Sequence, residues 1–244
     1  MLPKFSYSRP ESLSEALELL EEHGDEARLL AGGTDLLVSM RDRVVKPGLL
    51  IDVKGIKELG LLSYSEETGL KIGATVTLND LLASEVVKKR YSVLHEAVQT
   101  IADDQLRNRA TLVGNICNAS PAADSAPALL VLDAVVRVVG KGRERTIELK
   151  DFFRGVKKTA LERGELVSAV QIPSPPTGTR GRYLKAMRVW SEDLAIVGVA
   201  ALVGAKSSRE MRGTLGSPTP RLPQPPYDHT KLRQSSAGVH QQSS

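Results

Sequence analysis

The sequence predicts an α+β fold, in which helices and strands follow one another without the regular βαβ spacing of a doubly wound sheet. Three observations favour this class: a capped amphipathic helix near the amino terminus, short apolar runs bounded by glycine or proline, and two pairs of runs with hairpin spacing. With 244 residues, the chain is long enough for more than one domain.

The first segment, residues 1–55, is expected to form a compact unit of helices and strands. Ser12 and Glu15 have the spacing of a capping box, and Gly24 can end the helix that they begin. The elements predicted after this helix are, in order, a strand at 27–31, a helix that starts at Thr34 or Asp35 and reaches about residue 43, and a strand at 49–53.

The second segment, residues 56–173, begins with a predicted hairpin that pairs 61–64 with 70–74 around a polar turn. Thr77 and Asp80 then predict a capped helix. The further elements predicted here are a helix at 92–101, a helix that begins at Asp124, and a hairpin that pairs 135–139 with 145–149.

A C-terminal domain is expected at 182–206, after the linker-like stretch 174–181. Residues 183–189 alternate as a strand does, and 194–203 are strongly apolar. From about residue 207, Ser, Pro, Gln and Arg dominate and apolar residues become sparse. We therefore expect an incomplete domain followed by a disordered tail at 207–244.

Composition excludes several kinds of site. Cys117 is the only cysteine and the four histidines lie far apart, so we expect no disulfide, zinc site or iron–sulfur cluster. The net charge of +4 is concentrated in the tail, and no basic run is interleaved with aromatic residues, which argues against nucleic-acid binding. A signal peptide and a membrane span are not expected, so the predicted location is the cytoplasm. Any redox chemistry then needs a bound organic cofactor.

Two glycine-bearing motifs, which we expect to form backbone loops, could bind such a cofactor: AGGTD at residues 31–35 and TLVGN at residues 111–115. Glycine lets backbone N–H groups approach and surround a pyrophosphate. Taken alone, AGGTD could equally be an ordinary tight turn between a strand and a helix. The second motif belongs to a longer stretch of small and polar residues, 109–129. This stretch could be an irregular loop with a helix cap at Asp124 and a core thiol at Cys117. Neither motif is the GxGxxG of a Rossmann fold or a P-loop.

These motifs resemble those of the medium, FAD-binding subunit of the molybdenum hydroxylases, the family of xanthine dehydrogenase and carbon monoxide dehydrogenase. The resemblance covers roughly residues 1–205. It is most specific in NASPAADSAPAL at residues 118–129, and it continues through Phe152-Phe153, Glu165-Leu166-Val167, Ile172-Pro173, Tyr183-Leu184-Lys185 and Asp193-Leu194-Ala195.

The resemblance implies an FAD-binding fold of the vanillyl-alcohol-oxidase (PCMH) type, with two α+β subdomains and a C-terminal domain. The two glycine-bearing motifs would hold the pyrophosphate, and Asp124 would lie near the sugar portion. The residues that would line the flavin pocket are Ile101, Ala102, Leu166 and Lys185. For Lys185 in that set, an exposed strand lysine is the alternative. The implied FAD-binding residues are Ala31, Gly32, Gly33, Thr34, Asp35, Ile101, Ala102, Thr111, Gly114, Asn115, Asp124, Leu166 and Lys185.

The resemblance also implies partners. A small subunit with [2Fe–2S] clusters would pass electrons from a large subunit with the molybdenum cofactor, and FAD would hand them to an external acceptor. Family members usually continue into a packed third domain, whereas this pattern decays after about residue 215, as a frameshift or truncation would produce. Apolar core surface would then be exposed. The alternative functions are a cofactor-free scaffold descended from the family and, ranked last, a stand-alone flavin oxidase.

Overall fold

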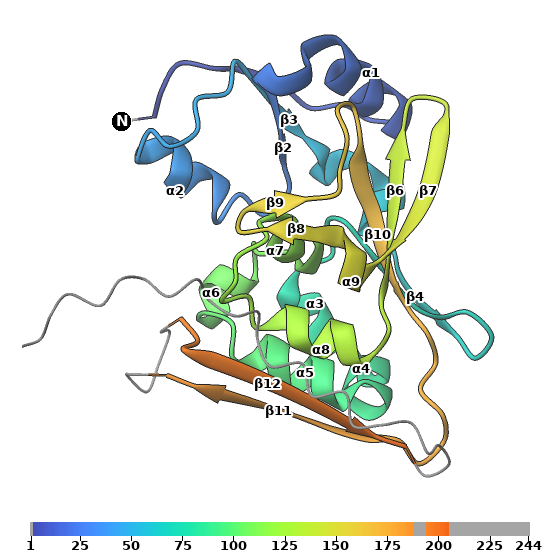
Figure 1. Ribbon diagram of the computed structural model, residues 1–244. Coiled ribbons are helices and arrows are strands. Elements are labelled where there is room, and N and C mark those ends of the chain that lie inside the picture. Colours follow the sequence, from blue (N-terminus) through green and yellow to red (C-terminus); the bar gives the residue numbers. More distant parts are fainter. Residues whose placement is uncertain (1, 188–193, 205–244) are drawn as a thin grey trace, which may run out of the picture.

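The computed structural model describes residues 2–187 and 194–204, and these form an α+β architecture with three main sheets (Figure 1). The predicted α+β class is confirmed. The expected tail at 207–244, and residues 188, 189 and 193 of the C-terminal segment, lie outside the described residues. No helix in the described ranges is both long enough and apolar enough to cross a membrane.

The amino-terminal sheet has the order β1-β3-β2 and is parallel. The strands β2 and β3 confirm the two predicted in this segment, and the helix α1 buries Ala16, Leu17 and Leu20. The elements are β1 (Ser6–Ser8), α1 (Leu13–His23), η1 (Gly24–Glu26), β2 (Ala27–Leu30), α2 (Leu36–Arg41), β3 (Leu49–Asp52), η2 (Val53–Gly55) and η3 (Lys57–Gly60).

Only one of the two hydrogen bonds of the predicted capping box of α1 is present. The Ser12 hydroxyl accepts a hydrogen bond from the Glu15 N–H at 3.2 Å. The Glu15 carboxylate, however, accepts from the N–H of Glu11 at 3.0 Å instead of that of Ser12. By contrast, Thr77 and Asp80 form the complete box that the sequence predicts.

The second sheet is antiparallel, with the order β4-β5-β10-β6-β7. Both predicted hairpins are present, as β4–β5 and β6–β7, and β10 is inserted between them. The elements are β4 (Leu62–Ser65), β5 (Gly69–Gly73), β6 (Val135–Gly140), β7 (Arg143–Glu148), α9 (Leu149–Phe152) and β10 (Leu166–Ile172), with the small hairpin β8 (Phe153–Gly155) and β9 (Lys158–Thr159) between α9 and β10.

A group of helices follows β5 and leads to β6, and it lies between the five-stranded sheet and the C-terminal hairpin in Figure 1. The predicted helix at 92–101 is α5, which ends two residues earlier than expected. The stretch TLVGN is not a loop, because its last four residues begin the helix α7. The elements are α3 (Leu78–Ala83), α4 (Glu85–Arg90), α5 (Ser92–Gln99), α6 (Asp104–Arg107), α7 (Leu112–Cys117) and α8 (Ser125–Val131).

The C-terminal hairpin pairs β11 (Arg180–Ala186) with β12 (Val197–Val203). Tyr183 and Ala200 are buried on its inner face, which packs against α5 and α8. The Glu96 carboxylate of α5 accepts from the Tyr183 backbone N–H at 2.8 Å. On the outer face, Leu184 is 71% exposed and Val203 is 62% exposed.

Candidate functional site

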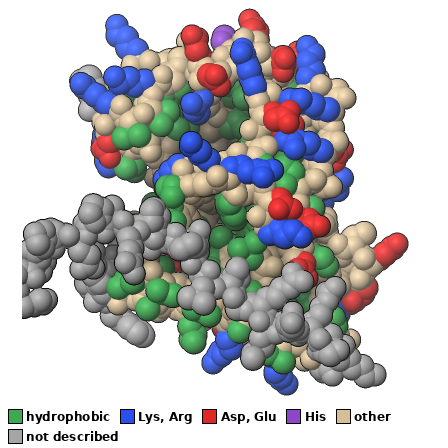
Figure 2. Space-filling model, in the orientation of Figure 1, with side chains coloured by type: hydrophobic (Ala, Val, Ile, Leu, Met, Phe, Trp, Pro, Cys, Tyr) green, Lys and Arg blue, Asp and Glu red, His purple; other side chains and the backbone are tan. Residues whose placement is uncertain are grey.

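A cavity of about 610 Å³ lies where the amino-terminal unit meets the second sheet and α7. This volume is within the range of roughly 300–1,000 Å³ that is usual for ligand pockets. In Figure 2 the surface is hollowed between the regions of α2 and the β8–β9 hairpin, and basic side chains border the hollow. Nine of the predicted site residues line the cavity: Ala31, Gly32, Gly33, Thr34, Asp35, Thr111, Gly114, Asn115 and Leu166.

The AGGTD motif lines this cavity and carries unpaired backbone donors. The N–H groups of Gly32, Gly33, Thr34 and Asp35 have no hydrogen-bond partner within the described residues. Gly33 adopts φ +75°, a conformation that glycine accepts without strain. Asp35 occupies the N-cap position of α2 but makes no side-chain cap bond, so the predicted cap is wrong. A row of free amides in a concave site is suited to an anion.

Gly32 lets the two motifs touch. A Cβ atom at this position would collide with the backbone carbonyl oxygen of Arg109 and would lie 3.0 Å from the Cα of Ala110. Arg109 and Ala110 lead directly into Thr111, where the second motif begins. A glycine at position 32 is therefore required for this close approach of the two backbone segments.

The second motif works as the start of a helix. Thr111 is the N-cap of α7, and its hydroxyl accepts from the Gly114 N–H at 3.0 Å. The Asn115 N–H is bonded to the Thr111 carbonyl oxygen at 3.0 Å. The expectation that the Gly114 backbone N–H is available to a phosphate is thus wrong, because the cap already uses it. The Asn115 side chain lines the cavity and remains a candidate donor.

The other four predicted residues, Ile101, Ala102, Asp124 and Lys185, gather in a second group that does not line the cavity. The Lys185 ammonium donates to the Asp124 carboxylate and to the Thr100 carbonyl oxygen, both at 3.0 Å. The guanidinium of Arg107 donates to the carbonyl oxygens of Ile101 at 2.9 Å and Ala102 at 2.6 Å. We call Thr100–Ala102, Asp124, Tyr183 and Lys185 the lysine cluster.

The ion pair in the lysine cluster is buried. The side chains of Lys185 and Asp124 are 4% and 8% exposed, so the alternative of an exposed strand lysine is wrong. Asp124 also accepts from the Tyr183 hydroxyl at 2.7 Å. Burial, and then this hydrogen bond to a carboxylate, raise the pKa of Tyr183. Asp124 precedes α8 but does not cap it, because its carboxylate oxygens are bonded to β11 instead.

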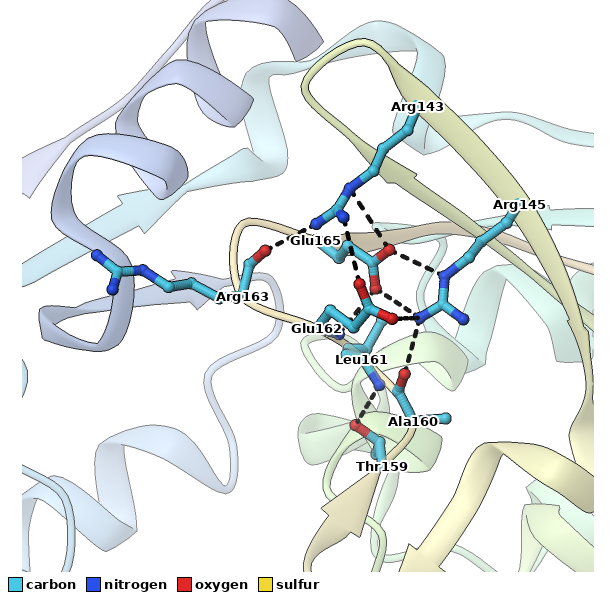
Figure 3. A network of polar contacts seen from close by, with 8 residues as sticks. All are labelled: Arg143, Arg145, Thr159, Ala160, Leu161, Glu162, Arg163 and Glu165. Atoms are coloured by element: carbon cyan, nitrogen blue, oxygen red, sulfur yellow. Dashed lines mark hydrogen bonds and ion pairs between the residues drawn. The ribbon is translucent and has the colours of Figure 1, made fainter.

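A charged network holds the loop that leads into Leu166, the first residue of β10 (Figure 3). Arg145 binds the Glu165 carboxylate through two hydrogen bonds of 2.9 and 2.8 Å, and the Glu162 N–H donates to the same carboxylate at 2.8 Å. The Glu165 side chain is 1% exposed. The hydrogen bond from Arg145 lowers the pKa of Glu165. The sequence reading included Glu165 only in a family motif and missed this structural role.

Replacement of Glu165 by glutamine is expected to make stability less dependent on acid pH. The folded-state pKa of Glu165 lies below its ordinary value of 4.5, so its contribution is present above that value and is lost as the pH falls through the folded-state pKa. Urea unfolding followed by circular dichroism between about pH 7 and pH 3 measures this. The control is the variant Glu67→Gln, which changes an exposed carboxylate. If the unfolding free energy of Glu165→Gln depended on pH as that of the unmodified chain does, Glu165 would not be the group responsible.

Two further features of the cavity were not predicted. Its basic lining residues are Arg28, Lys157 and Arg163, and the Lys157 ammonium donates to the Asn118 side-chain oxygen at 2.7 Å. Cys117 also lines the cavity, and burial raises the pKa of its thiol to about 12. No group of three or more His, Cys, Asp or Glu residues in the described ranges could hold a metal ion. Four acidic residues, Asp25, Asp35, Glu162 and Glu165, also line the cavity, so its lining has no net positive charge. What suits it to an anionic ligand is the set of unpaired N–H groups at residues 32–35.

Comparison with known proteins agrees with this geometry. The family described as "FAD binding domain in molybdopterin dehydrogenase" matches residues 3–175. The glyceraldehyde dehydrogenase medium chain of Sulfolobus acidocaldarius is 36% identical over 206 residues, which cover 84% of this chain and 72% of that protein. A xanthine dehydrogenase FAD-binding subunit of Escherichia coli O157:H7 is 32% identical over 198 residues, covering 80% of this chain and 67% of that one.

A solved structure supports the same fold assignment. Carbon monoxide dehydrogenase from Hydrogenophaga pseudoflava superposes with a TM-score of 0.81 at 36% identity, over 86% of this chain and 72% of that chain. The FAD-binding fold implied by the resemblance is thereby confirmed. The chain therefore belongs to the family of FAD-binding domains of molybdopterin dehydrogenases, and that family identifies FAD as its cofactor.

Proposed function

We propose that this chain is the electron-transfer subunit of a molybdenum hydroxylase complex and that it holds FAD in the cavity between the two glycine-bearing motifs. The observation that carries the proposal is the row of unpaired N–H groups from Gly32 to Asp35, residues that line a cavity of suitable size. These groups fit a pyrophosphate, whose oxygens accept several hydrogen bonds from closely spaced backbone donors.

The remaining predicted residues suggest how FAD would be oriented. The Asn115 side chain and the Thr34 hydroxyl would add donors beside the amides. Leu166, which is 1% exposed, would form part of the cavity wall behind the cofactor. The lysine cluster does not line the cavity, but Ser125 connects Asp124 to Asn115 in the cavity wall. Asp124 would lie near the sugar portion of FAD, and Ile101, Ala102 and Lys185 would lie toward the flavin. Lys185 is already paired with Asp124 at 3.0 Å, so the pair would present little net positive charge to the ring.

Bound FAD would supply reversible acceptance and release of electrons. The chain itself would bind the cofactor, orient it and exclude water from the pyrophosphate. A small [2Fe–2S] subunit and a large subunit with the molybdenum cofactor would deliver the electrons, and an external acceptor would remove them. The division into segments 1–55, 56–173 and 182–206 is retained as part of this proposal. The first two segments each contain one main sheet, whereas the third sheet begins at Arg180, within the expected linker 174–181.

Cofactor content tests the first half of the proposal. The purified chain, expressed alone and with its partner subunits, is expected to carry a yellow ligand that acid releases and that has the absorbance and mass of FAD. Titration of the cofactor-free chain with FAD would give a saturable change in flavin fluorescence. A colourless chain that binds partners but no FAD under either condition would instead support the cofactor-free scaffold.

Electron transfer is tested with the assembled complex. In a rapid-mixing experiment, substrate added to the complex is expected to bleach the flavin absorbance only when the partner subunits are present. Turnover of a small substrate by the isolated chain would contradict the proposal and would favour a stand-alone oxidase.

A further inference from the structure

Ser125 makes a buried contact with the cavity wall. It is the first residue of α8, is 0% exposed, and its hydroxyl lies 2.5 Å from the side-chain oxygen of Asn115. Asn115 lies on α7 and lines the cavity. This hydrogen bond is therefore a direct connection between α8 and a candidate cofactor-binding side chain.

The direction of this hydrogen bond follows from its surroundings. The Ser125 hydroxyl has no other hydrogen-bond partner among the described residues, so its single proton is donated to Asn115 Oδ1. If the Asn115 amide were reversed, that buried proton would be unpaired, which costs about 1–3 kcal/mol. The Asn115 NH₂ group, which has no partner in the described ranges, is then the part of the side chain left to meet a ligand.

The start of α8 is anchored on its other side as well. Asp124 immediately precedes Ser125, and its carboxylate is held by the Tyr183 hydroxyl at 2.7 Å and the Lys185 ammonium at 3.0 Å. This attachment to β11 limits movement of Ser125. A fixed Ser125 in turn keeps Asn115 in one orientation, which reduces the entropy lost when a ligand binds.

We propose that Ser125 is a positioning residue for the cofactor, because it aims the two N–H donors of the Asn115 amide at phosphate or neighbouring hydroxyl oxygens of FAD. This role rests on the proposed function. Ser125 itself does not line the cavity, so it acts only through Asn115. Removing the serine hydroxyl would leave the amide free to rotate and would weaken FAD binding without removing any cofactor contact.

A double-mutant cycle tests this role, with Ser125→Ala, Asn115→Ala and the double variant, and with FAD affinity measured by quenching of flavin fluorescence. In the unmodified background, Ser125→Ala is expected to weaken binding about 5- to 10-fold, as loss of one oriented hydrogen bond predicts. In the Asn115→Ala background the same change is expected to have less than a roughly twofold effect, since the residue it positions is gone.

Two results would overturn the role of Ser125 while leaving the proposed function intact. One is an equal loss of affinity from Ser125→Ala in both backgrounds, which would indicate a general disturbance of α8. The other is unchanged FAD affinity with lowered stability to urea, which would make the hydrogen bond purely structural. Failure of the unmodified chain to bind FAD would overturn the proposed function and this role together.

Discussion

Gly32→Ala is expected to abolish tight FAD binding. The new Cβ atom would collide with the backbone carbonyl oxygen of Arg109, and a backbone atom cannot rotate away as the end of a side chain can. The two motifs would have to separate, at a cost of roughly 1–3 kcal/mol in stability. Because the free N–H groups of residues 32–35 would move with them, we expect FAD affinity to fall by at least about 100-fold.

Gly60→Ala provides the matched control for this prediction. Gly60 has no left-handed φ, and its added Cβ atom would meet only the Thr75 hydroxyl at an ordinary 3.5 Å. Urea unfolding without FAD separates the loss of stability from the loss of affinity, which is measured by flavin fluorescence. If the Gly32→Ala variant bound FAD as tightly as the Gly60→Ala variant does, the close approach of the two motifs would be dispensable for binding.

Lys185→Met is expected to lower the free energy of unfolding by roughly 3–5 kcal/mol, the effect of leaving a buried charge without its partner. The Asp124 carboxylate, 8% exposed, would retain only its hydrogen bond from Tyr183. Urea or thermal unfolding followed by circular dichroism measures the change. The Lys158→Met variant, which removes an exposed lysine of β9, is expected to stay within about 0.5 kcal/mol of the unmodified chain.

The double variant Asp124→Asn with Lys185→Met separates charge from packing. It removes both members of the ion pair, so we expect it to regain at least about half of the stability that Lys185→Met loses. A double variant as unstable as the single one would mean that the aliphatic packing of Lys185, and not the pairing of charges, is what supports the hairpin.

Local signals in the sequence were sufficient for most helices and both hairpins. The Thr77–Asp80 box, the end of α1 at Gly24 and the β4–β5 turn depend on residues within a few positions of one another, and all three are found. The strand β10 was not predicted as an element, although 166–172 is an apolar run between Gly164 and Pro173. Its central place in the sheet depends on pairing with strands distant in the sequence.

The second motif shows why composition alone misjudged local structure. Small and polar residues favoured a loop at 111–115, yet Thr111 caps a helix that includes Gly114. The burial of Leu112, Val113 and Ile116 stabilises this short helix. Tertiary packing therefore outweighed the low helix propensity of glycine.

The sequence by itself determined the α+β class, the two glycine-bearing motifs and, through its resemblance to a known family, the FAD-binding fold. Those depend on short-range patterns of residue type. Only the tertiary structure decided that nine of the predicted residues share one cavity, whereas Lys185 and Asp124 form a buried pair beside it. The physical reason is that charge pairing and burial join side chains far apart in the chain, and no local pattern records which partner each one meets.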